Sequence, residues 1–337
     1  MRICTGLVTI DDLVPFIQAG AEEFYCGVID EQWLDRYNYI VALNRRPWPD
    51  ANFSSFAELA EVVNIAHAHG CQVFFTMNEH CYNNQQLGIL DYYLEQAVRC
   101  EVDAIIFADL GLAGYFADKK TNVDVHISTG GTIFNCYTAE MYTKEFHADR
   151  LILPRSLSMA EMKIIIESSP NTEFEVFIKN EGCTYIDGFC NFVHGTRFMN
   201  NNDGVIFNPP CVLRYQVIES ITPIPYDVPL LEKKLNWILD NKGDCGVCSL
   251  YYLNQLSVDS LKLVGRASDR SQVLSDIRMI KSAIDLCGEV ANFEEYHHMI
   301  SSQICQNSWK NDQLFTHCYY PEILDHVNGI HNVQGSV

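Results

Sequence analysis

The sequence predicts an α/β protein of the (β/α)8, TIM-like barrel class, with a cysteine-rich insertion between the seventh and eighth strands. Short β-branched or aromatic runs alternate with amphipathic helical stretches along nearly the whole chain. Eight such runs occur, which is the strand number of this barrel. An open doubly wound sheet usually carries G-x-G-x-x-G after its first strand, and none occurs here. The barrel is therefore favoured over the open sheet.

The eight expected strands are short, and each ends close to a polar or charged residue. They are RICTGL (2–7), EEFYCGV (22–28), QVFFTMN (72–78), DAIIFAD (103–109), DVHISTG (124–130), RLILPR (150–155), EFEVFIK (173–179) and SLKLVGR (260–266).

Helices are expected between these strands. The stretch 54–70 places Phe56, Leu59, Ala60 and Val63 on one face and ends in a glycine suited to a C-cap. Comparable stretches cover 86–100, 136–146, 158–169 (with Ser158 as N-cap) and 271–287.

The predicted barrel domain spans residues 1–290 and includes an insertion over 180–259, while residues 291–337 form a C-terminal extension. Loops as long as the insertion are uncommon in compact domains and are usually functional. In a barrel this connection begins on the face where active sites are built. The insertion is therefore the first place to look for function.

Composition limits the class of protein. The chain has 337 residues, 48% of them hydrophobic and 20% charged, which is typical of a globular protein with a large core. The N-terminus lacks the pattern of a signal peptide, and no apolar run approaches about eighteen residues. We therefore expect a cytoplasmic protein without a membrane span.

The net charge of −20 argues against a nucleic-acid partner, because binding phosphates normally requires concentrated Lys and Arg. The only basic cluster is NRRPW, at 44–48.

The fourteen cysteines are expected to be thiols or metal ligands, since nothing suggests secretion. Those scattered in apolar segments are expected in the core: Cys26, Cys71, Cys100, Cys136 and Cys287.

Five cysteines gather in the insertion, namely Cys183, Cys190, Cys211, Cys245 and Cys248. A zinc site usually needs two close pairs, and only Cys245 and Cys248 form one. An iron–sulfur cluster tolerates wider spacing, and structural thiols prefer the core. Spacing favours a cluster but leaves zinc and structural thiols open.

Six segments, in the correct order, resemble motifs of the peptidase U32 family, also called the collagenase-like peptidase family. They are AGAEEFYCG, FFTMN, VDAIIFADLGL, HISTGGTIFN, LILPRSLSMAEM and VDSLKLVGR, and the resemblance extends from residue 1 to about 290. One departure follows the seventh strand, where the family has FvHGalC and this chain has FIKNEGC. The family's His and Gly thus become Lys179 and Asn180.

The resemblance implies a 4Fe–4S cluster on four of the cysteines. Carried over by position, the ligands are Cys183, Cys190, Cys211 and Cys248, with Cys245 as the alternate for the last.

The better-understood members of the family hydroxylate a tRNA uridine, a ribosomal RNA cytidine or a ubiquinone precursor without oxygen, and prephenate is implicated as the oxygen donor. The resemblance therefore implies a cluster-dependent hydroxylase or related redox modifier, and the acidity of the chain suggests a small-molecule or peptide substrate. Two alternatives remain: a peptidase or peptide-maturation enzyme, and a non-catalytic subunit paired with a family-related partner.

Protease motifs give little support to the first alternative. Neither G-x-S-x-G nor H-E-x-x-H occurs. The nearest candidates for a Cys–His dyad are His80, Cys81 and His194.

Polar residues at the expected strand ends predict the rest of the site. Cationic side chains there suit a dicarboxylate such as prephenate. The alternative is that Arg155 and Arg266 pair with carboxylates of the barrel. The predicted catalytic residues are Arg155, Lys179 and Asp109, and the predicted substrate-binding residues are Asn78, Ser128, Thr129 and Arg266.

Overall fold

The structure is a computed structural model that describes most of the chain. The described residues are 1–38, 41–180, 182–183, 185–190, 197–200, 203–206, 229, 244–266, 268–304 and 318–323. Cys211 and His194, two of the candidate site residues, lie outside them.

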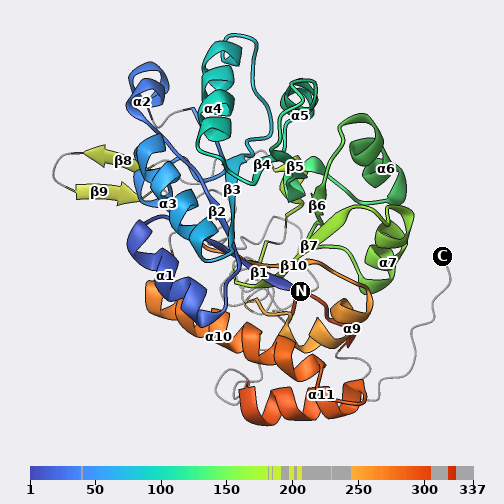
Figure 1. Ribbon diagram of the computed structural model, residues 1–337. Helices are drawn as coiled ribbons and strands as arrows, with labels where there is room; N and C mark the ends of the chain where they lie inside the picture. Colours follow the sequence, from blue (N-terminus) through green and yellow to red (C-terminus); the bar gives the residue numbers. More distant parts are fainter. Residues whose placement is uncertain are drawn as a thin grey trace.

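Eight parallel strands close into a barrel with helices around it, which confirms the predicted TIM-barrel fold (Figure 1). Around the barrel the order is β1 (Arg2–Gly6), β10 (Ser260–Leu263), β7 (Glu173–Lys179), β6 (Arg150–Ile152), β5 (Asp124–Ile127), β4 (Ala104–Phe107), β3 (Gln72–Met77) and β2 (Glu23–Cys26). All eight predicted strands are present.

Most of the predicted strands run a few residues too far at the carboxyl end. The strand that begins at Asp124 ends at Ile127, and Ser128 already caps a short 3-10 helix, η2 (Thr129–Gly131). The strand that begins at Arg150 likewise ends at Ile152, before Arg155. The polar residues at these ends therefore belong to the loops of the barrel mouth.

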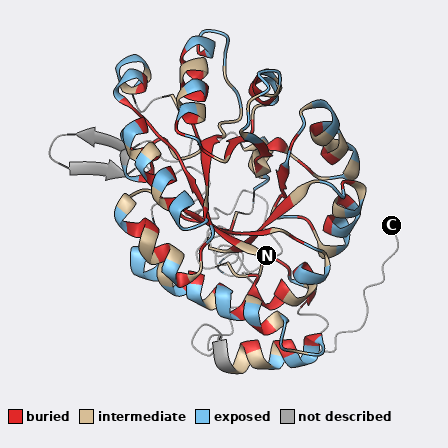
Figure 2. Cartoon of the chain, in the orientation of Figure 1, coloured by how far each residue is buried: buried red, intermediate tan, exposed pale blue. Residues whose placement is uncertain are grey.

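Helices cover the outside of the barrel and turn their apolar faces inward (Figure 2). They are α1 (Ile10–Ala19), α2 (Glu31–Tyr37), α3 (Phe56–Ala68), α4 (Leu87–Arg99), α5 (Leu110–Ala117), α6 (Cys136–Glu145), α7 (Met159–Ser168), α9 (Leu250–Gln255), α10 (Arg270–Cys287) and α11 (Phe293–Met299). No helix in the described residues is long and apolar enough to cross a membrane.

Helix starts follow the sequence signals closely. Ser158 caps α7 in a capping box with Glu161, as predicted. The buried face of α3 contains Val62 in addition to Phe56, Leu59 and Val63, whereas Ala60 is only partly buried. Of the scattered cysteines, Cys26, Cys71 and Cys100 are buried in the core, while Cys136 and Cys287 are partly exposed.

Two later segments return to the carboxyl end of β7. Asn180 donates its backbone N–H to the Asp244 carbonyl at 2.8 Å, and Gly246 donates to that of Ile178 at 2.7 Å. Residues 318–323 pack alongside, with the Tyr320 hydroxyl donating to the Phe177 carbonyl at 2.7 Å. Within the insertion, β8 (Arg197–Asn200) and β9 (Asp203–Ile206) pair as an antiparallel hairpin.

Candidate active site at the barrel mouth

A pocket opens at the carboxyl ends of the strands. Its volume is about 750 Å³, which includes solvent-filled space at the open mouth. Inward-facing side chains of the strands form its lower wall, and the loops that follow form its rim. The lining residues include Tyr25, Arg45, Arg46, Thr76, Asn78, His80, Ile106, Ser128, Thr129, Ile152, Arg155, Phe177, Asp187, Lys262 and Arg266. Five of these are Lys or Arg, so the pocket gathers positive charge within an acidic chain.

Arg155 lies at the rim, as predicted. Its guanidinium pairs with Asp187 and stacks over the Phe177 ring, 4.0 Å from the ring centroid. The Thr129 hydroxyl donates to the same Asp187 carboxylate at 3.1 Å. Asp187 belongs to the short 3-10 helix η3 (Asp187–Phe189) in the insertion, so the cysteine-rich loop forms one side of the pocket.

Arg266 is buried and donates hydrogen bonds to neutral oxygens. Its guanidinium lies 2.9 Å from Asn44 Oδ1, 3.1 Å from Thr76 Oγ1 and 3.4 Å from Asn52 Oδ1. A Cβ on Gly27 would lie 2.3 Å from Asn52 Oδ1, so this cluster requires the glycine that ends the AGAEEFYCG segment.

Lys262 forms the floor of the pocket and was missed from the sequence. Its ammonium lies 2.5 Å from Glu175 Oε1 and 4.1 Å from the centroid of the Tyr25 ring. Burial opposes the charge, but Glu175 outweighs it and raises the pKa of Lys262. Lys262 therefore keeps its positive charge at the floor, paired with Glu175.

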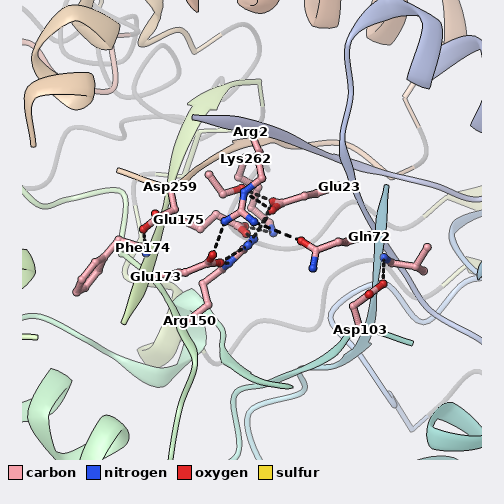
Figure 3. A network of polar contacts seen from close by, with 12 residues as sticks. Arg2, Glu23, Gln72, Asp103, Arg150, Glu173, Phe174, Glu175, Asp259 and Lys262 are labelled. Carbon is pink, nitrogen blue, oxygen red and sulfur yellow. Dashed lines mark hydrogen bonds and ion pairs between the residues drawn. The ribbon is translucent and has the colours of Figure 1, made fainter. Parts of the chain in front are cut away.

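A network of buried ion pairs supports this floor from below (Figure 3). Arg150 donates to Glu23 at 2.7 Å, to Glu175 at 3.2 Å and to Glu173 at 2.5 Å. Burial alone would raise the pKa of Glu175, yet Lys262 and Arg150 outweigh it and hold this pKa below its ordinary value. Glu175 therefore stays ionised and fixes Lys262 in place.

Five of the seven predicted catalytic and substrate-binding residues line the pocket, namely Asn78, Ser128, Thr129, Arg155 and Arg266.

The other two are not lining residues and make structural contacts. The Lys179 ammonium lies 3.5 Å from the buried carboxylate of Asp276. Asp109 caps α5 by accepting from the Leu112 amide at 2.6 Å, and it also accepts from the Tyr82 amide at 3.1 Å. Neither side chain is among the lining residues, so we give neither a role in the chemistry.

Of the described candidates for a Cys–His dyad, the histidine lines the pocket and the cysteine does not. His80 lines it, and burial, with Arg45 nearby, lowers the pKa of this imidazole. Cys81 is exposed and is not a lining residue.

Four cysteines of the insertion lie among the described residues, namely Cys183, Cys190, Cys245 and Cys248. Cys183 and Cys190 flank η3, and burial raises the pKa of the Cys183 thiol. Cys245 forms β-bridges with Lys179 and with Cys318, while Cys248 is buried three residues further on. No three of these four thiols lie within 4.8 Å of one another, and Cys211 lies outside the described residues, so the cluster stays a prediction.

In the described residues, the one set of three ligand atoms within 4.8 Å of one another is that of Cys4, Glu23 and Glu175. Both carboxylates already accept from Arg150, and a cation there would be repelled by it and by Lys262. We therefore assign no metal to the barrel interior.

Comparison with known proteins agrees with the motifs. The family model described as peptidase family U32 matches residues 9–323, which include the segment 318–323 packed on β7. An uncharacterized protease of Methanocaldococcus jannaschii is 29% identical over 278 residues, which are 80% of this chain and 61% of that protein. The chain thus spans under two thirds of that relative.

Other relatives have more specific names. The tRNA hydroxylation protein P2 of Bacillus subtilis is 27% identical over 85% of both chains. The 23S rRNA 5-hydroxycytidine synthase of Escherichia coli is 26% identical over 65% of this chain and 32% of that protein. A solved U32 peptidase aligns with 53% of this chain and 68% of its own at 16% identity, with a TM-score of 0.42. From the match over residues 9–323, this chain belongs to peptidase family U32.

Proposed function

We propose that this protein takes part in an oxygen-independent hydroxylation of RNA, with the target base bound in the barrel-mouth pocket. The observation that carries this proposal is the gathering of five cationic side chains around one pocket in a chain of net charge −20. The names of the relatives, which concern tRNA and ribosomal RNA, support the same substrate class.

This proposal replaces the small molecule or peptide that the acidity of the chain suggested. Net charge sets the electrostatic potential far from the protein, but charges beyond about 10 Å are largely screened at ordinary ionic strength. Inside a partly enclosed pocket, the nearest groups set the potential. Arg45, Arg46, Arg155, Lys262 and Arg266 are those groups.

The pocket offers both kinds of contact that a nucleotide needs. Ile106, Ile152 and Phe177 give apolar wall for a base, and Asn78, Ser128 and Thr129 offer hydrogen-bonding groups at the rim. Lys262 and Arg266 would bind carbonyl oxygens or the carboxylates of an oxygen donor such as prephenate. These residues bind and orient, and the walls exclude water from the reacting base.

A 4Fe–4S cluster would be held by Cys183, Cys190, Cys211 and Cys248, with Cys245 as the alternate. When bound, it supplies the one-electron and Lewis-acid chemistry that protein side chains lack. Cys183 and Cys190 flank η3, and Asp187 of η3 lines the pocket. Such a cluster would therefore lie beside the cationic pocket.

The test is nucleoside mass spectrometry of tRNA and ribosomal RNA. The RNA is taken from a host that lacks its own RNA hydroxylation proteins and expresses this chain without oxygen. We expect a pyrimidine nucleoside that has gained one oxygen atom, and its loss in Arg266→Met and Lys262→Met. RNA without any such nucleoside, from cells that hold iron-loaded protein, would overturn the proposal.

A further inference from the structure

We propose that the stacked rings of Phe134 and Phe189 form a platform for an unpaired nucleotide adjacent to the base in the pocket. This inference rests on the proposed function and specifies the form of RNA that the site accepts. The ring centroids lie 6.5 Å apart with an interplanar angle of 15°. The Phe189 side chain is 67% exposed, which is unusual for a phenylalanine and leaves its ring available for a second stacking partner.

The platform is held firmly next to the pocket. Phe189 follows Asp187 by two residues within η3, and Asp187 lines the pocket in its pair with Arg155. A Cβ on Gly188 would lie 2.1 Å from Thr132 Cγ2 and 2.7 Å from the Gly130 carbonyl oxygen. This close packing of η3 against η2 fixes the position of Phe189 relative to the rim.

Several exposed apolar residues lie on the same face of the barrel as the pocket. Loops after parallel barrel strands, and the first turns of the helices that follow, lie at the carboxyl ends of those strands. The large exposed apolar residues in such positions are Leu87, Leu110, Tyr137, Tyr185, Ile186 and Phe189. Phe189 therefore shares the face of the charged pocket with other exposed apolar side chains.

Charge and ring geometry favour RNA as the occupant of this surface. Every base has a π-face that stacks on aromatic side chains, and RNA phosphates complement the arginines of the pocket. A base inside a duplex can neither enter the pocket nor stack on Phe189 without leaving its neighbours. The platform therefore selects a loop or a single strand over a duplex.

The experiment measures fluorescence anisotropy of a labelled RNA hairpin with a uridine-rich loop, and of a fully paired duplex built from the same stem. The protein is the full chain, loaded with iron and sulfide under anaerobic conditions. We expect the hairpin to bind more tightly than the duplex, and Phe189→Ala to weaken hairpin binding about 5- to 150-fold. Phe189→Trp keeps a stacking face and should restore the affinity.

Ile164→Ala is the matched control, because Ile164 is a 59% exposed apolar residue on α7 and is not a lining residue of the pocket. Its hairpin affinity should equal that of the wild type. Iron content is compared in every variant, since Phe189 precedes Cys190.

The outcomes separate the platform from the proposed function. If Phe189→Ala and the wild type bind the hairpin equally, or if hairpin and duplex bind equally, the platform is wrong and RNA as substrate survives. If wild-type protein binds neither RNA, both ideas fail. If Phe189→Ala instead dissolves a self-association seen by light scattering and keeps its RNA affinity, the face is a protein interface.

Discussion

The buried contact between Lys262 and Glu175 joins the pocket to the ion-pair network inside the barrel. Glu175 is fully buried, and it is shared between Lys262 and Arg150. Glu175→Gln keeps the shape but removes the negative charge between two buried cations. We expect a loss of about 3–5 kcal/mol in the free energy of unfolding, measured by urea denaturation.

Glu167→Gln is the control for this variant. Glu167 pairs with Lys163 on α7 at 3.8 Å, and both side chains are more than half exposed. Exposed pairs of this kind contribute less than about 1 kcal/mol. Equal losses in the two variants would mean that the interior network does not stabilise the barrel.

Asp124 gives the fold a pH dependence. Burial, followed by the charges of Asp149 and Glu173, raises the pKa of Asp124 to about 6. A carboxyl group whose pKa is higher in the fold than the unfolded value of about 3.9 binds its proton more tightly when folded, so its contribution to stability is lost as the pH rises from about 4 to about 6. Asp124→Asn should raise the melting temperature at neutral pH and leave it unchanged near pH 4, by calorimetry. Because Asp124 is only partly withdrawn from solvent, which screens its neighbours' charges, the gain should be modest.

Position in the fold also distinguishes Cys248 from Cys245. Cys245 is held between Lys179 and Cys318 by β-bridges, whereas Cys248 is buried in the short 3-10 helix (Val247–Ser249) that precedes α9. We expect Cys248→Ser to lose iron after anaerobic reconstitution, along with Cys183→Ser, Cys190→Ser and Cys211→Ser. Cys245→Ser, Cys318→Ser and the core variants Cys26→Ala and Cys71→Ala should retain it. Equal loss at Cys245 and Cys248 would contradict this choice of the fourth ligand.

At the scale of elements, the strands and helices could be predicted because each has a local cause. Alternating apolar runs specify the strands, and Ser158 with Glu161 specifies the start of α7. Contacts between distant strands are different. The barrel prediction already makes β7 and β10 neighbours, but Lys262 was missed because it lies within its strand, and the sequence does not show the register that places it beside Glu175, 87 residues away.

The predicted site shows the same division. Rim residues such as Arg155 and Ser128 were found because parallel strands end on one face, which follows from the fold class alone. Lys179 also ends a strand, but it turns to Asp276 on α10. The pattern of the sequence does not show where this helix, almost a hundred residues further along the chain, packs against the barrel.

The segment 318–323 packs against β7 and is part of the folded unit. Tyr320 is 2% exposed, donates to the Phe177 carbonyl and packs against Gly246, where a Cβ would lie 2.9 Å from its ring. Tyr320→Ala should cost about 3–5 kcal/mol in the free energy of unfolding, and Tyr320→Phe about 1 kcal/mol. Tyr137→Ala, at an 81% exposed site, should change it by less than about 0.5 kcal/mol. Loss of stability no larger in Tyr320→Ala than in Tyr137→Ala would show that the segment is not part of the folded unit.

At the scale of the whole molecule, the net charge of −20 should govern how RNA binding depends on salt. A protein that neutralises Z phosphates of a single strand loses affinity with a slope of about −0.7Z in log K against log salt. Three of the five pocket cations already face carboxylates, Arg155 with Asp187, Arg45 with Glu79 and Lys262 with Glu175, so we expect few phosphates to be neutralised. We expect a slope no steeper than about −2 for the uridine-rich hairpin.

The salt dependence of the association rate should show whether RNA is recognised by one cationic pocket or attracted by a broad basic surface. Long-range repulsion between an acidic protein and RNA is strongest at low ionic strength, so moderate salt should speed association while dissociation changes little. Stopped-flow anisotropy across a salt series measures both rates. A basic RNA-binding protein gives the opposite trend, with association that slows as salt rises. If this chain did the same, or if its equilibrium slope were as steep as about −5, RNA would be held by a broad basic surface, and recognition through one cationic pocket would be wrong.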